Sequence, residues 1–191
     1  MKSILKVCKQ WCWGLWILVL SSCGQGAQTT PENERRDSSD STRQLVLIRS
    51  RIDSLERVLA KDSLAQGNHE NLLDSLGTLC VELANRYQNT PYAPVALWKA
   101  ARAFRAAGSY PQAIACGKAL TEAFPQHDLA ASALFHNALI FNEDLQNTAS
   151  AAFYLDRLLE EYPTDSLASQ AQAMKELLGL SEEELNRRLR K

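Results

Sequence analysis

The chain has 191 residues, with 21 Lys and Arg against 22 Asp and Glu, so its net charge at pH 7 is −1. A chain so close to neutrality has no excess of basic residues with which to bind nucleic acid or anionic lipid. We therefore expect no nucleic-acid partner.

The first 22 residues have the organisation of a secretory signal. Three lysines and no acid precede an apolar stretch from Trp11 to Leu20, which is the order of regions in such a signal. A membrane-spanning helix needs about 20 apolar residues, and this stretch is half that length and contains Gly14. We expect residues 1–22 to direct export and to be cleaved. Cleavage removes Lys2, Lys6 and Lys9 but none of the 22 acids, so the mature chain is more acidic.

The residues at the end of this stretch are Leu20-Ser21-Ser22-Cys23. They resemble the lipobox of bacterial lipoproteins, which implies a lipid on the sulfur of Cys23 and cleavage just before it. An ordinary cleaved signal with an incidental cysteine is the alternative. The following Gly24-Gln25-Gly26 has neither the Asp that resembles an inner-membrane retention signal nor an acidic cluster resembling a surface-export signal. We therefore expect a lipid-anchored protein at the periplasmic face of the outer membrane.

Residues 24–43 contain no large apolar side chain and are rich in Ser, Thr, Gln and charge. This composition is typical of disorder, so we expect residues 23–43 to be a lipidated tether. Asp40-Ser41-Thr42 resembles the O-glycosylation triad of Bacteroidetes exported proteins, which implies a modification of Ser41. Related Asp-Ser-Leu triads begin at Asp53, Asp62, Asp74 and Asp165.

Only Cys80 and Cys116 would remain as thiols after export, because Cys8 and Cys12 leave with the signal. One disulfide is conceivable in an oxidising compartment. Apolar, helical surroundings favour two free, buried thiols instead.

The remainder of the chain is predicted to be all-α, because Ala and Leu dominate and apolar residues recur at intervals of three and four. We expect a helical segment over residues 44–70 and a repeat domain over 71–191. Three of the predicted helices end at an aromatic residue. These residues are Tyr87, Phe124 and Tyr162, which are spaced by 37 and 38 residues. The predicted helices are Leu72–Tyr87, Pro94–Ala107, Leu129–Asn142 and Leu167–Leu178, with Asp128 and Ser166 as N-caps.

At these positions the chain resembles the tetratricopeptide repeat family, whose unit is two antiparallel helices, A and B. The first unit matches through Leu97, Ala100, Ala101, Phe104, Gly108, Tyr110, Ala113 and Pro125, and the second through Leu134, Asn137, Ala138, Phe141, Ala151, Leu155 and Pro163. Gly117 departs from the family, which usually has a bulky aromatic there. The second turn, NEDLQNT, has an extra residue and no Gly. The third unit is expected to end in a short capping helix that begins at Ser181. The resemblance implies a short helical-repeat solenoid.

The apolar residues Leu45, Ile48, Ile52, Leu55 and Leu59 mark one face of a helix predicted over residues 43–64. This face can pack within the chain, as part of a degenerate first repeat. Alternatively, its spacing can form a coiled coil between chains. We favour the intramolecular packing and a monomer.

The resemblance also implies a binding groove lined by the A helices. Its candidates are Trp98, Arg102 and Arg105 from the first unit and Phe135, Leu139 and Asn142 from the second. Trp and Arg are enriched in binding hot spots. The alternative is that Trp98 packs against the preceding helix pair while the arginines are solvated.

We find no catalytic motif, no phosphate-binding loop and no metal-ligand spacing among His69, His127 and His136, which we interpret as turn or surface residues. We expect no enzyme, cofactor or metal. The chain is distantly similar to the lipoprotein subunit of the outer-membrane β-barrel assembly machine and to the periplasmic cell-division coordinator of the Tol system. We therefore expect an adaptor that binds an envelope protein; an oligomeric spacer or a cell-division or cell-wall coordinator is the alternative.

Overall fold

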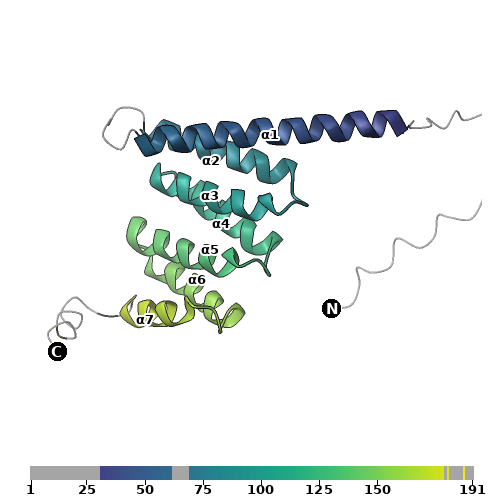
Figure 1. The fold of residues 1–191 in the computed structure, drawn as a ribbon. Coiled ribbons are helices and arrows are strands. Elements are labelled where there is room, and N and C mark those ends of the chain that lie inside the picture. Colours follow the sequence, from purple (N-terminus) through teal and green to yellow (C-terminus); the bar gives the residue numbers. More distant parts are fainter. Residues whose placement is uncertain (1–30, 62–68, 179, 181–186, 188–191) are drawn as a thin grey trace, which may run out of the picture. The chain divides into compact units, whose positions relative to one another are not determined.

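The structure is a computed structural model that describes residues 31–61, 69–178, 180 and 187, with the side chains described from residue 40 onward (Figure 1). The signal, Cys23 and the capping helix predicted from Ser181 lie outside the described residues. The chain divides into two units between Ser38 and Ser39, and apart from the start of α1 the account below concerns the second.

The described residues form α-helices and one π-helical turn, with no strand among them, so the all-α prediction is confirmed. The elements are α1 (Pro31–Lys61), α2 (His69–Arg86), α3 (Tyr92–Ala106), α4 (Tyr110–Ala123), α5 (Leu129–Leu139), the π-turn η1 (Ile140–Asp144), α6 (Thr148–Glu161) and α7 (Ala168–Leu178).

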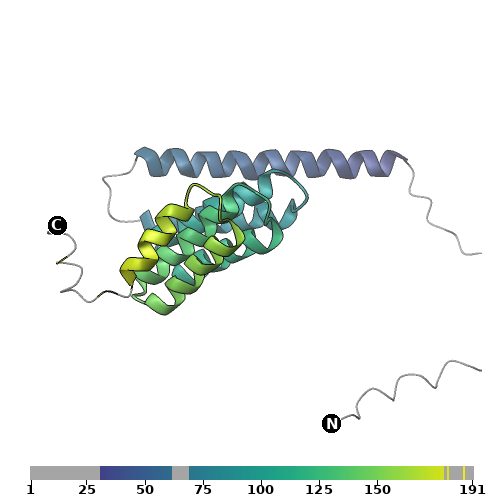
Figure 2. The same ribbon diagram turned by 90° about the horizontal axis from the view of Figure 1, so that it is seen from below.

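Successive helices from α2 to α7 pack against one another, and α3 also contacts α5. In Figures 1 and 2, α3, α5 and α7 form one layer, and α2, α4 and α6 form the other. This arrangement of stacked helix pairs is the predicted helical-repeat solenoid. The pairs are α3 with α4 and α5 with α6, and α7 is the first helix of a third unit.

The predicted disordered tether over residues 23–43 is wrong from residue 31 onward, because α1 begins at Pro31. The composition argument missed the local signal for a helix start. Pro suits the first helical turn, because its missing backbone N–H would have no intrahelical partner there. Ser41 is consequently an exposed residue of a helix, and its carbonyl accepts a hydrogen bond from the Tyr87 hydroxyl at 2.8 Å.

The three turns that precede α3, α5 and α7 have the same hydrogen bonds, which confirms the spacing of the repeat. In each turn the backbone N–H three residues after the aromatic donates to the aromatic's carbonyl, at 3.1 Å for Thr90 to Tyr87, His127 to Phe124 and Asp165 to Tyr162. Asp128 lies at the N-cap of α5, as predicted, but its side chain makes no capping hydrogen bond. In both turns the residue before the predicted cap supplies the side-chain acceptor. His127 Nδ1, not Asp128, accepts from the Leu129 N–H, and Asp165 Oδ1, not Ser166, accepts from the Leu167 N–H.

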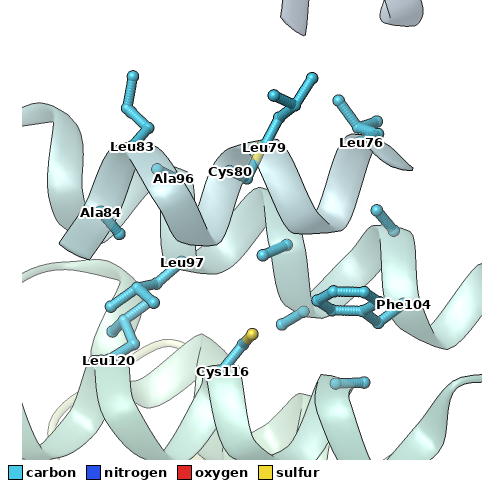
Figure 3. Close-up of a cluster of buried hydrophobic side chains, with 14 of the residues drawn as sticks. Leu76, Leu79, Cys80, Leu83, Ala84, Ala96, Leu97, Phe104, Cys116 and Leu120 are labelled. Carbon is cyan, nitrogen blue, oxygen red and sulfur yellow. The ribbon is translucent and has the colours of Figure 1, made fainter. Parts of the chain in front are cut away.

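The main core lies between α2, α3 and α4 (Figure 3), where leucines and Phe104 meet small residues. Ala101 and Ala113 are fully buried, as the family resemblance implies. Gly77 of α2 is needed because a Cβ there would lie 2.7 Å from the Phe104 ring. Cys80 and Cys116 are free and buried. Burial raises the pKa of Cys80 to about 12 and that of Cys116 to about 11, so neither thiol is a reactive thiolate.

Helix α1 uses its apolar face within the chain. Ile48 and Ile52 are buried in the same core as α2 and α3. Polar contacts also hold α1, since Lys99 of α3 pairs with Glu56 at 2.6 Å and Arg86 of α2 donates to Gln44 at 3.0 Å. This is the intramolecular packing that the sequence favours, and it occupies the face that a coiled coil between chains would need.

The extra residue of the second turn is absorbed by the π-turn η1, which continues α5. Gln146 follows it with a φ of 52°, in the left-handed region. In the first unit Gly108 has the corresponding conformation, with a φ of 76°. A π-helical turn is how an α-helix accommodates one inserted residue, so the two units keep the same packing despite their different lengths.

Candidate functional site

The candidate site is the surface of α3 and α5 that carries the six predicted groove residues, hereafter the A-helix face. Arg102 is exposed, whereas the other five side chains are half-buried. The first three members belong to α3, Phe135 and Leu139 belong to α5, and Asn142 belongs to η1. The structure thus places all six on two neighbouring helices of one layer, α3 and α5 with its continuation η1, although they do not all remain available to a ligand.

Trp98 packs against the following helix as well as the main core. Its ring meets His136 of α5 edge-on, with 5.3 Å between the ring centroids. Trp98 therefore fills the space between two neighbouring helices of one layer while keeping part of its surface in solvent. Half-burial with an exposed edge is common for an aromatic residue that serves both packing and recognition.

Arg105 is a structural residue, and this corrects its assignment to the groove. Its Nε donates to Asp144 Oδ2 at 2.7 Å, and its Nη2 donates to Glu143 Oε2 at 2.6 Å. Burial alone would lower the pKa of Arg105, but the hydrogen bonds to Glu143 and Asp144 raise it above its usual value. Both acids lie on η1, so Arg105 fixes the π-turn of one unit to the first helix of the preceding unit.

We expect Arg105→Ala to lower the free energy of unfolding by about 1 kcal/mol, because it removes two charge-assisted hydrogen bonds at a partly exposed site. Arg102→Ala is the matched control on the same helix. No ion pair of Arg102 is found in the described part of the chain, so its loss should cost less than about 0.5 kcal/mol. Urea unfolding of both variants measures the difference, and equal costs would contradict the structural assignment of Arg105.

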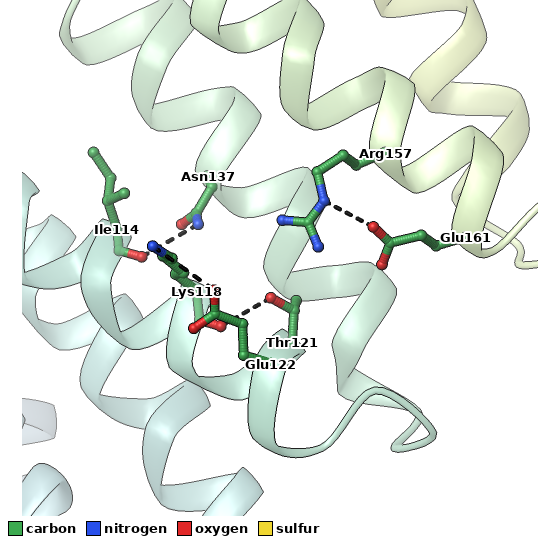
Figure 4. A network of polar contacts seen from close by, with 7 residues as sticks. All are labelled: Ile114, Lys118, Thr121, Glu122, Asn137, Arg157 and Glu161. Carbon is green, nitrogen blue, oxygen red and sulfur yellow. Dashed lines mark hydrogen bonds and ion pairs between the residues drawn. The ribbon is translucent and has the colours of Figure 1, made fainter. Parts of the chain in front are cut away.

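Two polar residues lie in the protein interior behind the A-helix face. Asn137 was matched to the repeat from the sequence, but the contacts of its amide were not predicted. His136 was expected at a turn or surface but is only 9% exposed, and its Nδ1 has no hydrogen-bond partner. Burial, and then the charges of Arg105 and Arg102, lower its pKa to about 4. The fully buried Asn137 donates from Nδ2 to the Ile114 carbonyl at 3.3 Å (Figure 4).

The remaining candidates are the possible metal ligands and the Asp-Ser-Leu triads. Among the described residues, no cluster of His, Cys, Asp and Glu could hold a metal ion. The Asp-Ser-Leu triads at Asp53 and Asp74 lie in helices, the one at Asp165 lies in the turn before α7, and the one at Asp62 lies outside the described residues. Ser166 in that turn is exposed, as is Ser41 in α1.

No helix in the described part of the chain has the length and the apolar character needed to cross a membrane.

Comparison with protein families identifies residues 132–165 as a tetratricopeptide repeat. The match spans most of α5, η1, α6 and the turn that follows. The match and the paired helices together support a tetratricopeptide-repeat protein. Comparison with the curated proteins and with the solved structures gave no significant match.

Repeats of this class mediate protein–protein interactions and are typically not enzymes. The class of function that the fold supports is therefore a protein-interaction adaptor.

Proposed function

We propose that the protein is a lipid-anchored adaptor of the bacterial cell envelope that binds another envelope protein through its A-helix face. The tether to the membrane is the lipid on Cys23, and we place it at the periplasmic face of the outer membrane. The sequence Leu20-Ser21-Ser22-Cys23 behind a short apolar stretch supports the anchor.

The observation that carries the binding role is the composition of the A-helix face. Trp98 and Phe135 are half-buried aromatic residues, and Arg102 is exposed beside them without an ion pair in the described part of the chain. An aromatic residue that is already held in place loses little entropy on binding, and an unpaired arginine can form a charge-assisted hydrogen bond with a partner. Arg105 does not contribute to the binding of a partner, because its Nε and Nη2 already donate to Asp144 and Glu143.

A crosslinked pull-down from native membranes, read by mass spectrometry, tests the binding role. We expect one envelope protein to be recovered with the wild type and to be lost with Trp98→Ala and with Arg102→Glu. Arg51→Ala is the control, because Arg51 lines a groove between α1 and α2 and is not part of the A-helix face. Recovery that is unchanged by both variants, or that contains only crosslinks of the protein to itself, would contradict the proposal.

Fractionation of cells that express Cys23→Ala tests the anchor. We expect the wild-type chain in the membrane fraction with the added mass of a lipid, and the variant in the soluble fraction or uncleaved. A variant that is cleaved and remains in the membrane fraction would show that Cys23 is not the anchor.

A further inference from the structure

Positive and negative charges are distributed unevenly between α1 and the repeats. From residue 40 to residue 61, α1 has three acids and five bases, the latter being Arg43, Arg49, Arg51, Arg57 and Lys61. One of the acids, Glu56, is paired with Lys99 of α3. From His69 to Leu178 the chain has twelve acids and only seven bases. The nearly neutral net charge of the whole chain therefore conceals a basic helix beside an acidic repeat domain.

Three of these bases lie on the side of α1 that faces away from the repeats, hereafter the outer face of α1. With 3.6 residues per turn, Arg43, Arg57 and Lys61 lie within about 60° of the direction opposite the buried face of Ile48 and Ile52. All three bases are exposed. None of them forms an ion pair within the described part of the chain. Asp53 is the one acid of the outer face, which therefore has a net positive charge.

The outer face of α1 also exposes large apolar side chains between its bases. Val46 is 60% exposed and Leu47 is 56% exposed, although both belong to a helix whose other apolar residues pack into the core. Bases that alternate with apolar side chains on one helix face are typical of helices that lie on an anionic lipid surface. The bases attract the headgroups, and the apolar side chains enter between them.

The acidic repeats make this attraction directional. An anionic surface attracts the outer face of α1 and repels the excess of acids in the repeats, so the two effects favour the same orientation. Each base near such a surface strengthens binding by about fivefold. A net charge of this size gives only weak binding to free chains in solution.

The proposed anchor makes a weak attraction sufficient. Cys23 lies eight residues before Pro31, the first residue of α1, so the chain between them can span no more than about 30 Å. A surface to which the chain is already attached is met within the same assembly, at a high effective concentration. Attraction that would be marginal between separate molecules can then set the orientation of α1.

We propose that the outer face of α1 lies on an anionic lipid surface, with the repeats directed away from it. That an anchor on Cys23 holds the chain there rests on the proposed function. The attraction of α1 to lipid does not, because it follows from the charges and exposed side chains of the helix itself. The expectation that the chain does not bind anionic lipid considered its net charge alone, and this proposal replaces it.

Sedimentation with lipid vesicles tests the attraction. The chain from residue 23 to 191, with Cys23→Ser to prevent lipidation, contains the whole described fold. It is mixed with vesicles of phosphatidylcholine alone or with vesicles that contain about one third phosphatidylglycerol, an anionic lipid. We expect at least about fivefold tighter binding to the anionic vesicles at low salt. This difference should disappear near 1 M salt, where the screening length is about 3 Å.

Two doubly charge-reversed variants separate the outer face of α1 from the net charge. Arg43→Glu with Arg57→Glu should weaken binding to anionic vesicles at least about tenfold. Arg102→Glu with Lys118→Glu is the matched control, because it changes the net charge equally at exposed residues of α3 and α4. We expect the control to change the affinity by less than about threefold, since these residues lie away from the proposed contact. Helix content and the unfolding midpoint confirm that both variants are folded.

Tryptophan fluorescence tests whether the apolar side chains enter the lipid. The mature chain contains only Trp98, which Trp98→Phe removes. In this background Val46→Trp places a reporter on the outer face of α1, and Ala115→Trp places one at an exposed position of α4. Anionic vesicles should shift the emission of the first reporter to shorter wavelengths and leave the second unchanged.

Equal binding to the two kinds of vesicle, equal losses for the two charge-reversed variants, or unchanged emission from Val46→Trp would overturn the proposal. The vesicles contain no protein partner and the chain has no lipid, so the outcome is independent of the pull-down and of the anchor. In cell fractionation, a wash with about 1 M salt releases a chain held by charge alone but not a lipid-anchored one. An anchor confirmed after this wash, without vesicle binding by the unlipidated chain, would leave the proposed function standing while this proposal fails.

Discussion

Gly117→Ala is expected to lower the free energy of unfolding by about 1 to 3 kcal/mol, although Ala is normally the better residue in a helix. A Cβ at position 117 would lie 2.5 Å from Asn137 Oδ1 and 2.9 Å from its Cγ. Asn137 cannot move aside easily, because it is fully buried and its Nδ2 donates to the Ile114 carbonyl (Figure 4). The glycine of α4 and the asparagine of α5 are therefore a matched pair.

A double-mutant cycle measured by urea unfolding tests this coupling. Asn137→Ala removes the obstructing amide, so adding Gly117→Ala in that background should stabilise the protein by up to about 1 kcal/mol, through helix propensity and the filling of the space left. The coupling energy between the two substitutions should therefore be about 1 kcal/mol or more. Ala115→Gly, at an exposed position of α4, gives the effect of Gly against Ala without the contact. Additive effects within about 0.5 kcal/mol would contradict the matched pair.

This pair shows what the sequence could and could not predict. The departure of Gly117 from the repeat pattern was visible, and it indicated either a closer helix or a gap. The contact of Gly117 with Asn137 was not predictable. Asn137 occupies a position where the previous unit has Ala100, so the repeat pattern gives no reason to expect an amide there. Only the packing of α5 on α4 brings this amide to the glycine. The helix pairs, by contrast, were predictable since each turn repeats an aromatic and its spacing.

The same distinction holds for the A-helix face. Sequence spacing placed its six residues on neighbouring helices, because residues on one face of a helix recur every three or four positions. The spacing could not show that Arg105 donates hydrogen bonds to Glu143 and Asp144, which lie 38 and 39 residues further along the chain. The acids belong to the irregular second turn. Its extra residue is visible in the sequence, but it does not reveal which side chains the resulting π-turn brings to Arg105.

The start of α1 was missed for a different reason. The argument for a tether relied on the absence of large apolar residues from 24 to 43, but a helix that continues from a packed segment needs no apolar face of its own. From Leu45 onward the apolar spacing predicted the buried face correctly, with Ile48 and Ile52 at 6% and 5% exposure.

His136 is expected to make stability fall on mild acidification, by about 2 kcal/mol between pH 7 and pH 4.5. Its pKa is about 4 in the folded chain, against about 6.5 in an unfolded one. Between these two values the unfolded state binds the additional proton, so the free energy of unfolding rises with pH across this window and is lost as pH falls. Burial is the main cause, and Arg105 and Arg102 add repulsion that Asp144 only partly offsets.

Urea unfolding of the wild type and of His136→Phe at a series of pH values between 4.5 and 7 isolates this contribution. Phe keeps an aromatic ring against Trp98 but does not titrate, so the variant should lose the slope that His136 causes while the carboxylates titrate as before. Parallel curves for the wild type and His136→Phe would mean that His136 takes up its proton in the folded chain without opening the interface between α3 and α5.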